Sequence, residues 1–134
     1  MVKFMRYKIK ELKIHSDERG WLVEMLKRNE IKEDIKQIYV ATIKPGYVRG
    51  NHYHLKRIEW FMIIKGEVEF CLEDIKTKER VCLKLSSKKP EVITVFPKIA
   101  HAVKNIGKET SYLVSAQNTI YNPQDPDTFP YLIY

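Results

Sequence analysis

Three histidines and one glutamate have the residue types and the spacing of a metal or acid–base site. His52 and His54 lie between Gly46 and Gly66, in GYVRGNHYHLKRIEWFMIIKG, and Glu59 follows them. Side chains at i and i+2 of a strand point to one face, so the two imidazoles are expected to face the same space. Imidazole nitrogens and a carboxylate suit a divalent ion such as Zn, Fe, Mn or Ni. A neutral imidazole is also a general base.

His101 extends this set from a distant segment, FPKIAHAVKN, which also predicts a turn followed by a strand. The chain has four histidines, and three of them fall in these two segments. Glu59 lies within the apolar run IEWFMII, where an unpaired carboxylate would be costly to bury. An H-x-H pair alone also occurs on strands without function, but a buried charge needs a partner. We therefore expect His52, His54, Glu59 and His101 to form a divalent metal site, and His15 to be an ordinary surface residue.

Short strands must position these residues. Apolar alternation and turn residues predict strands at Ile9–Ile14, Trp21–Leu26, Gln37–Ile43, Gly50–His54, Trp60–Ile64, Val68–Leu72, Val81–Leu85, Val92–Phe96, His101–Asn105 and Ser111–Ala116. One helical turn is expected at Asn29–Asp34, and the C-terminal YNPQDPDTFPYLIY is expected to form an ordered strap. Strands at this regular spacing imply a sandwich or barrel. The sequence therefore predicts a single all-β domain over residues 1–134.

Bulk composition restricts the partners. A chain of 134 residues with 44% hydrophobic content can build a proper core. No segment approaches the length of a membrane span, and the charged N-terminus lacks the apolar centre of a signal peptide. We expect a cytoplasmic protein without a membrane partner. The net charge of +7 suggests anionic partners. Because the positive charges are scattered among acidic residues, a phosphorylated small molecule is favoured over nucleic acid.

The two cysteines flank a polar turn. A symmetric hairpin centred on Lys76 and Thr77 would set Cys71 opposite Cys82. In a reducing compartment thiols are the default state, so free thiols are expected. A cross-strand disulfide is the alternative.

Several segments carry a family resemblance. Gly46–Gly66 resembles the first motif of the cupins, and Pro97–Asn105 resembles the second, although it is one residue shorter and lacks the usual glycine before the histidine. Asp17–Glu24 resembles the N-terminal strand of dTDP-4-dehydrorhamnose 3,5-epimerases, and RGNHY at Arg49–Tyr53 is similar to their R-G-L-H-Y. Tyr112–Ala116, with the YNP that follows, resembles their C-terminal tyrosine segment. The resemblance implies an antiparallel cupin jelly-roll barrel, a homodimer, and a nucleotide-sugar in the barrel mouth.

The same resemblance implies roles for single residues. His52 matches the general base of the epimerases, and Tyr112 is matched to the acid on the opposite face. Arg49 matches an arginine near the nucleotide-sugar, and Asn51 beside it is expected to contact substrate. The implied function is an epimerase of a nucleotide-linked 4-keto-deoxysugar in polysaccharide or deoxysugar biosynthesis, which removes a proton next to the ketone.

Two positions depart from the rhamnose-epimerase pattern. Glu59 stands where those enzymes carry an enolate-stabilising lysine, and His54 stands where they have no second histidine. Both changes restore the metal-binding cupin set, and the segment is similar to the metal-bearing cupin domain of capsular-polysaccharide enzymes. We favour a metal-loaded site in which Tyr112 or another group moves the proton. In the alternative, the site is metal-free and His52 is the base. A sugar 3,4-ketoisomerase, a non-catalytic metal- or sugar-binding cupin and a metal-dependent dioxygenase are the other functions that the pattern allows.

Overall fold

The computed structural model of the protein describes residues 7–134, and short antiparallel strands dominate it. The predicted domain starts at residue 1, and residues 1–6 lie outside the described part. The elements are β1 (Tyr7–Glu11), β2 (Ile14–Asp17), β3 (Gly20–Val23), the 3-10 helix η1 (Arg28–Glu30), β4 (Gln37–Ile43), β5 (Val48–Tyr53), β6 (Glu59–Lys65), β7 (Glu67–Asp74), β8 (Arg80–Ser86), β9 (Glu91–Val95), β10 (Ile99–Asn105), β11 (Ser111–Gln117) and β12 (Phe129–Pro130).

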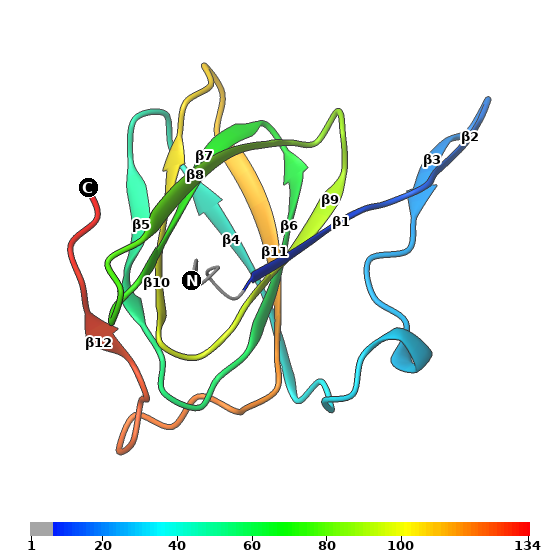
Figure 1. Cartoon of the computed structure of the whole chain (residues 1–134). Helices are drawn as coiled ribbons and strands as arrows, with labels where there is room; N and C mark the ends of the chain where they lie inside the picture. The colour runs from blue at the N-terminus through cyan, green and yellow to red at the C-terminus, as the bar shows by residue number, and fades with distance from the viewer. Residues whose placement is uncertain (1–6) are drawn as a thin grey trace.

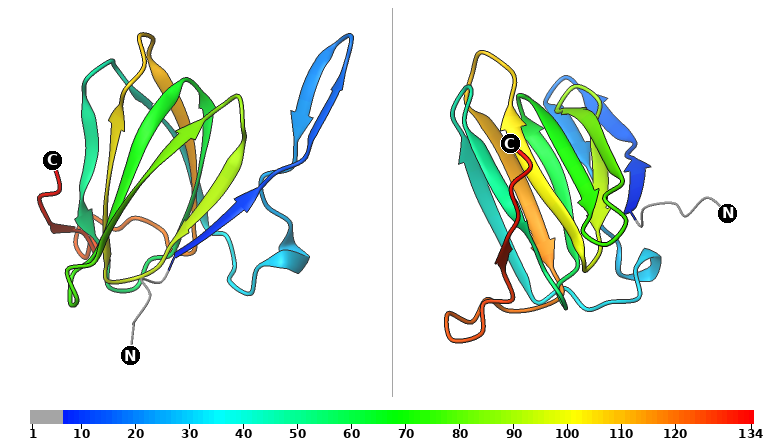
Figure 2. Two further views of the ribbon diagram at one scale, coloured as in Figure 1. Left: turned by 45° about the horizontal axis from the view of Figure 1, so that its top comes forward. Right: turned by 60° about the vertical axis from the view of Figure 1, so that its left-hand side comes forward.

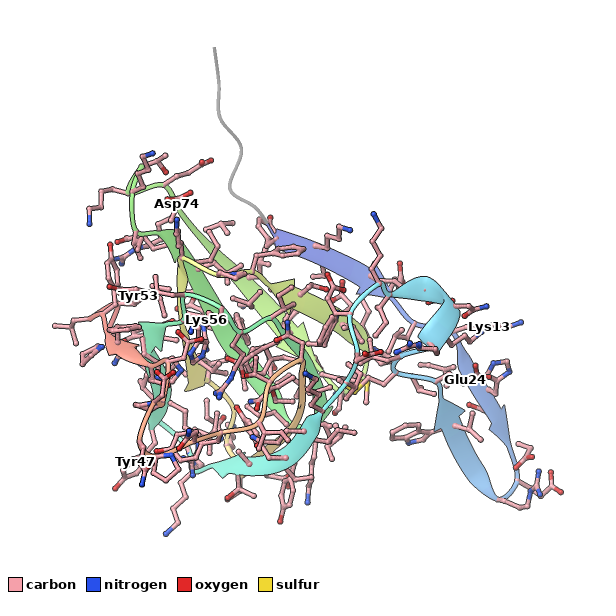
Figure 3. The ribbon with its side chains drawn as sticks, turned by 90° about the horizontal axis from the view of Figure 1, so that it is seen from below. Lys13, Glu24, Tyr47, Tyr53, Lys56 and Asp74 are labelled. Carbon is pink, nitrogen blue, oxygen red and sulfur yellow. A yellow bond between two sulfur atoms is a disulfide. The ribbon has the colours of Figure 1, made fainter. Side chains whose placement is uncertain are left out.

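Two five-stranded sheets form the walls of a barrel (Figure 1). Their strand orders are β1-β9-β6-β11-β4 and β12-β5-β10-β7-β8, and β2 pairs only with β3 in a separate hairpin. The two sheets face each other in the further views (Figure 2). Seen from below, the arm that carries Lys13 and Glu24 stands apart from the barrel (Figure 3). The predicted all-β class is confirmed.

The core lies between the sheets. Apolar side chains from both walls fill it, among them Phe61, Ile63, Phe70, Leu72 and Ile93. The opposite face of β6 is apolar too, as its sequence indicated, and Trp60 and Met62 are buried there. Side chains of the chain's own segment 25–35 pack over them. Both faces of β6 are therefore covered within one chain.

The predicted strand Ile9–Ile14 is two strands in the structure. β1 follows β9 as far as the pair Glu11 and Glu91, and Leu12 then donates its N–H to the carbonyl of Pro90 at 3.0 Å. Proline has no N–H to return, so the ladder ends there and the chain leaves the barrel. The second predicted strand ends early, at Val23, and η1 is shorter than the expected helical turn.

The expectation of free thiols is wrong, because Cys71 and Cys82 form a disulfide. The polar turn makes β7 and β8 a symmetric hairpin, in which the two cysteines are direct cross-strand partners. Directly opposite residues bring their Cβ atoms close enough for such a bond. The expectation that a reducing compartment keeps cysteines as thiols was therefore not enough to predict the state of this pair.

The C-terminal strap is ordered, as predicted. β12 adds to the free edge of β5 and pairs Phe129 with Tyr53 and Pro130 with His52. Within residues 7–134, no helix has the length and apolar character needed to cross a membrane.

Candidate metal and acid–base site

A bulge in β5 aims His52 into the barrel. The β5–β10 register shifts after the pair His52 and His101, so Asn51 is an extra residue with no partner on β10. Gly50 and Asn51 both have positive φ, of 93° and 57°. A Cβ on Gly50 would lie 2.7 Å from the carbonyl oxygen of His101, so only glycine fits this close approach. Such bulges re-aim the side chain that follows.

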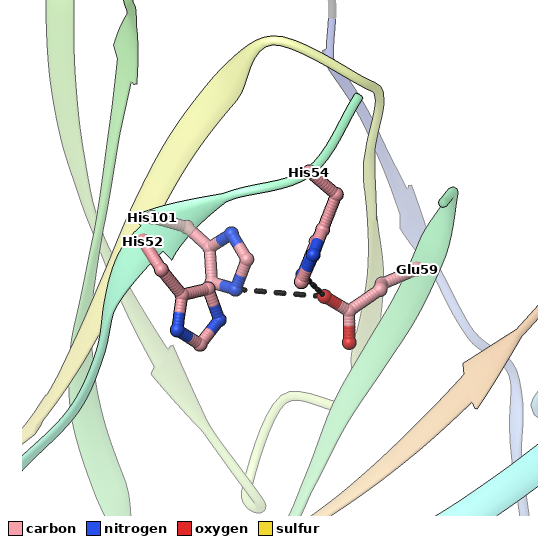
Figure 4. A group of neighbouring side chains, drawn as sticks. All are labelled: His52, His54, Glu59 and His101. Atoms are coloured by element: carbon pink, nitrogen blue, oxygen red, sulfur yellow. Dashed lines mark hydrogen bonds and ion pairs between the residues drawn. The ribbon is translucent and has the colours of Figure 1, made fainter. Parts of the chain in front are cut away.

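The structure brings the four predicted residues together inside the barrel (Figure 4). The ring centroids of His52 and His101 lie 4.7 Å apart, and those of His52 and His54 lie 5.0 Å apart. His54 and His101 are buried, whereas His52 is only partly buried. One potential ligand atom from each residue lies within 4.8 Å of the others. The cluster is therefore approached from the side of His52.

Glu59 is the electrostatic centre of the cluster. Its side chain is 2% exposed, and Oε1 accepts a hydrogen bond from Nε2 of His54 at 2.7 Å. Oε2 accepts from Ser115 Oγ at 3.1 Å and from Gln117 Nε2 at 2.9 Å. Burial alone raises the pKa of a carboxyl group, but the bond from His54 and the nearby imidazoles outweigh it and lower the pKa of Glu59 to about 2. Glu59 is therefore an anion at neutral pH.

The imidazoles of His52 and His101 are neutral at that pH. Burial lowers the pKa of His101 to about 3. Burial, followed by the charge of His54, also lowers the pKa of His52. Nε2 of His101 lies 3.6 Å from Oε1 of Glu59, and its buried Nδ1 has no hydrogen-bond partner among residues 7–134. Unprotonated nitrogens beside one carboxylate are what a divalent cation or a departing proton requires.

The donor set fits a divalent transition metal. Three imidazoles and one carboxylate converge. One ligand atom from each residue lies within 4.8 Å of the others, so the four residues could hold one ion between them. Oε1 of Glu59, which faces two of the rings, would be the carboxylate ligand.

Tyr112 does not reach this site. Its neighbour Leu113 points into the core, so Tyr112 points outwards, is 38% exposed and lies beside Lys65. Tyr39 takes the inner position instead. It pairs across β4 and β11 with Ser115, which bonds to Glu59, and directly opposite residues share a face.

The Tyr39 phenol interacts with the Ser115 hydroxyl, and burial followed by the charge of Glu59 raises its pKa to about 12. The side chain is nevertheless 37% exposed. Tyr39 is therefore a protonated phenol, on a partly exposed side chain, on the wall that faces His52. The period-2 pattern of Gln37–Ile43 could have indicated it, had the pairing with Ser115 been known.

The predicted substrate-binding residues differ in placement. Arg49 pairs with the core residue Val103 and so lies on the inner side of β5, but its side chain is exposed, and its Nε donates to the carbonyl of Thr42 at 2.8 Å. Asn51 faces the strap instead, where Oδ1 accepts from the N–H groups of Ile133 and Tyr134. A substrate contact of Asn51 stays a prediction.

Sequence reasoning missed a second cation. Arg57 is 6% exposed, and its Nε donates to Thr119 Oγ1 at 2.9 Å. Its charge contributes to the lowered pKa of His52 and opposes the raised pKa of Tyr39. Arg57 precedes Glu59 by two residues, and side chains at this spacing on an extended chain share a face. That spacing was the sequence signal that could have pointed to Arg57.

An antiparallel jelly-roll barrel with histidines and a carboxylate on its inner wall defines a cupin. The family model for the polysaccharide biosynthesis C-terminal domain matches residues 15–129, and the chain belongs to that family. A solved structure supports the fold. The chain superimposes on the Legionella pneumophila dTDP-6-deoxy-D-glucose-3,5-epimerase RmlC, solved with dTDP-4-keto-L-rhamnose, with a TM-score of 0.82, covering 92% of this chain and 71% of that one at 22% identity.

Two curated relatives are similar in sequence. The chain is 30% identical over 127 residues to the probable low-salt glycan biosynthesis epimerase Agl13 of Haloferax volcanii, covering 89% of this chain and 81% of that protein. It is 32% identical over 119 residues to the UDP-2-acetamido-2,6-beta-L-arabino-hexul-4-ose reductase of Pseudomonas aeruginosa. That match covers 89% of this chain but 31% of the longer reductase.

The buried imidazole of His101 predicts a loss of stability in acid. Its pKa is about 3 in the folded protein and 6.5 as the reference value, so the unfolded chain binds more protons between these values. The free energy of unfolding should therefore fall as pH drops from 6.5, by up to about 1.4 kcal/mol per pH unit from this residue. Urea unfolding of chelator-treated protein between pH 7 and pH 4.5 measures it.

In His101→Gln, the free energy of unfolding should depend less steeply on pH between pH 7 and pH 4.5, which lies above the range in which Glu59 takes up a proton. Exposed His15→Gln is the matched control and should keep the wild-type slope. Equal slopes for wild type and His101→Gln would contradict the assignment.

Proposed function

We propose that the protein is an epimerase of a nucleotide-linked 4-keto-deoxysugar in polysaccharide or deoxysugar biosynthesis, acting by proton exchange next to the ketone at a site that holds a divalent metal. The gathering of His52, His54, Glu59 and His101 inside the barrel carries this proposal. Family membership and the similarity to Agl13 support the sugar chemistry. The finer points, which are the metal, the acid and the dimer, rest on the geometry.

The metal would be held by the three imidazoles and by Oε1 of Glu59. A divalent ion there supplies Lewis-acid polarisation of the sugar ketone, which acidifies the neighbouring C–H. The protein keeps this position ready, because Ser115 and Gln117 bond only to Oε2 and leave Oε1 facing the rings. In the loaded protein His52 is a ligand. In the metal-free protein its lowered pKa leaves it neutral and able to accept a proton.

Tyr39 is proposed as the acid that returns the proton. Its raised pKa keeps the phenol protonated at neutral pH, and its partial exposure opens it to a ligand in the barrel. It stands on the sheet opposite His52, which is the base of the metal-free alternative, so in that form the two groups would address a bound sugar from different sides. In the loaded protein, where His52 would be a ligand, Tyr39 is the group that would move the proton. This assignment takes the place of the role predicted for Tyr112.

Arg49 is proposed to bind the diphosphate of the nucleotide. It lies on the inner side of β5, and the one hydrogen bond that it donates within residues 7–134 uses Nε, which leaves both terminal nitrogens for a paired contact with phosphate oxygens. The positive charges of Arg49 and Arg57 both act on Tyr39. Two such cations match the negative charge of a nucleoside diphosphate.

A homodimer is proposed from the apolar surface. The β2–β3 hairpin exposes Trp21 and Leu22 at 59% and 58%, and the edge strand β4 exposes Ile38 and Val40 at 63% and 61%. Exposed apolar side chains on a projecting hairpin and on an unpaired strand edge are a self-association surface.

Metal analysis tests the ligand set. Purified wild-type protein should carry close to one equivalent of Zn, Fe, Mn or Ni, and Glu59→Gln should lose most of it because the neutral amide is a poor ligand. Elemental analysis after dialysis is the measurement, with the exposed Glu109→Gln as matched control. Retention of full metal by His52→Ala would remove His52 from the ligand set.

Deuterium exchange tests the reaction and the acid. Wild-type protein in heavy water should place deuterium beside the ketone of a dTDP- or UDP-4-keto-6-deoxy sugar, as mass spectrometry can show. Tyr39→Phe should slow product formation about 10²- to 10⁴-fold, the usual contribution of a general acid. Tyr112→Phe is the matched control and should keep the wild-type rate. No uptake with any such sugar would sink the enzyme assignment, and a larger loss in Tyr112→Phe would overturn the role of Tyr39.

Light scattering tests the dimer. Wild-type protein should run at twice the chain mass, and a double Ile38→Glu, Val40→Glu variant should run as a monomer because the charges oppose association. Leu132→Glu, at a strap residue that is 78% exposed, is the control and should stay dimeric. A wild-type monomer at high protein concentration would refute the proposal.

A further inference from the structure

The carboxylate of Asp127 organises the loop between β5 and β6. Oδ1 accepts the backbone N–H of Leu55 at 2.8 Å, and Oδ2 accepts those of Lys56 and Arg57, each at 3.0 Å. Figure 3 looks at this end of the barrel and labels Lys56 of the loop. Three consecutive amides bound by one side chain fix the loop to the C-terminal strap. This loop directly joins His54 to Glu59, so its position sets the distance between the two residues.

The backbone carbonyl of the same residue contacts His54. The oxygen of Asp127 lies 2.6 Å from Nδ1 of His54. A carbonyl oxygen can only accept, so Nδ1 must carry the proton of this hydrogen bond. Nε2 donates to Oε1 of Glu59 at 2.7 Å, because an ionised carboxylate can only accept. Both ring nitrogens therefore carry a proton in the metal-free protein, and Nε2 is the one that would exchange its proton for a metal. One strap residue thus binds the loop through its side chain and the ring through its main chain.

The conformation of Asp127 restricts what can replace it. Its φ is 49°, in the left-handed region that aspartate, asparagine and glycine enter more readily than other residues. Of these three, only aspartate has two equivalent acceptor oxygens for three N–H donors. The position therefore needs both the backbone freedom and the carboxylate.

The strap also holds His52, the histidine of β5. Tyr131 donates its N–H to the carbonyl of Asn51 at 2.8 Å, and Pro130 pairs with His52. Oδ1 of Asn51 accepts the N–H of Ile133 at 3.0 Å. The bulge that aims His52 and the ring of His54 are thus both fastened to the same C-terminal segment.

We propose that Asp127 is a positioning residue of this site: its carboxylate docks loop 55–57 on the strap, which places its own carbonyl against His54 and fixes the orientation and tautomer of that ring for a divalent transition metal. Outer hydrogen bonds of this kind orient metal-binding histidines and typically change affinity 10- to 100-fold when removed. The metal part rests on the proposed function, whereas the proton on Nδ1 does not.

Nitrogen NMR of ¹⁵N-histidine protein tests the proton on Nδ1 directly, since four imidazoles are few enough to assign. In metal-free and in Zn²⁺-loaded wild type, Nδ1 of His54 should carry a proton in slow exchange. Asp127→Asn and Asp127→Gly both allow the left-handed backbone, and both should lose that protected proton. Asn122→Ala removes a turn bond to Gln124 within the same strap and should leave it unchanged.

Co²⁺ titration against a competing chelator adds a second readout. The affinity should fall about 10- to 100-fold in Asp127→Asn and Asp127→Gly and change little in Asn122→Ala. Thermal unfolding of each variant separates loss of positioning from loss of fold. An unprotonated Nδ1 in wild type overturns the proposal, as does a folded Asp127→Gly with unchanged proton protection and Co²⁺ affinity. If the protein bound no Co²⁺, the proposed function would fail, and the Nδ1 proton of the metal-free protein would still decide the role of Asp127.

Discussion

The buried negative charge of Glu59 is the constraint on which the site depends. A carboxylate that is 2% exposed would be expensive without partners. The chain meets this cost from two sides, with imidazoles at Oε1 and the neutral donors Ser115 and Gln117 at Oε2. Since the neutral donors occupy one oxygen, the histidine side of the carboxylate is free to exchange a proton for a cation. The hydrophobic core lies beneath, with Phe61 and Phe70 against the ring of His101. These apolar rings offer no hydrogen bond to the carboxylate.

The backbone places the partners of Glu59 by local devices. The Gly50–Asn51 bulge turns His52 inwards, and the strap on the other side of β5 fastens both the bulge and the ring of His54. Asn51 therefore has a structural task in the motif: it adopts a positive φ and binds the strap with the same residue. The C-terminal strap adds a strand to the edge of β5, and its contacts position His52 and His54.

The sequence predicted the all-β class and the four clustered residues because both depend on period-2 spacing and on the cost of burying Glu59. It did not predict Tyr39 as the tyrosine on the inner wall. Tyr112 and Leu113 are adjacent, and a single step along a strand exchanges the inner face for the outer one. Only the pairing of Ser115 with Tyr39 reveals which tyrosine faces inwards. The break after Glu11 likewise depends on Pro90, a partner far away in the chain. The hairpin that opposes Cys71 and Cys82 could be read from the sequence, but the redox state of the pair could not.

Glu59 also links the metal position to the proposed acid. Burial raises the pKa of Tyr39 to about 12, and the negative charge of Glu59 adds to that rise, while the Ser115 hydroxyl contacts both groups. A cation bound at Oε1 would offset this negative charge and so remove its part of the rise in the pKa of Tyr39, while the part caused by burial would remain. The phenol would then release its proton more easily when the site is loaded than when it is empty. The metal position and the proposed acid would therefore be coupled through one carboxylate, since Glu59 on β6 and Tyr39 on β4 belong to the same sheet. This coupling would let the phenol move the proton when His52 serves as a ligand.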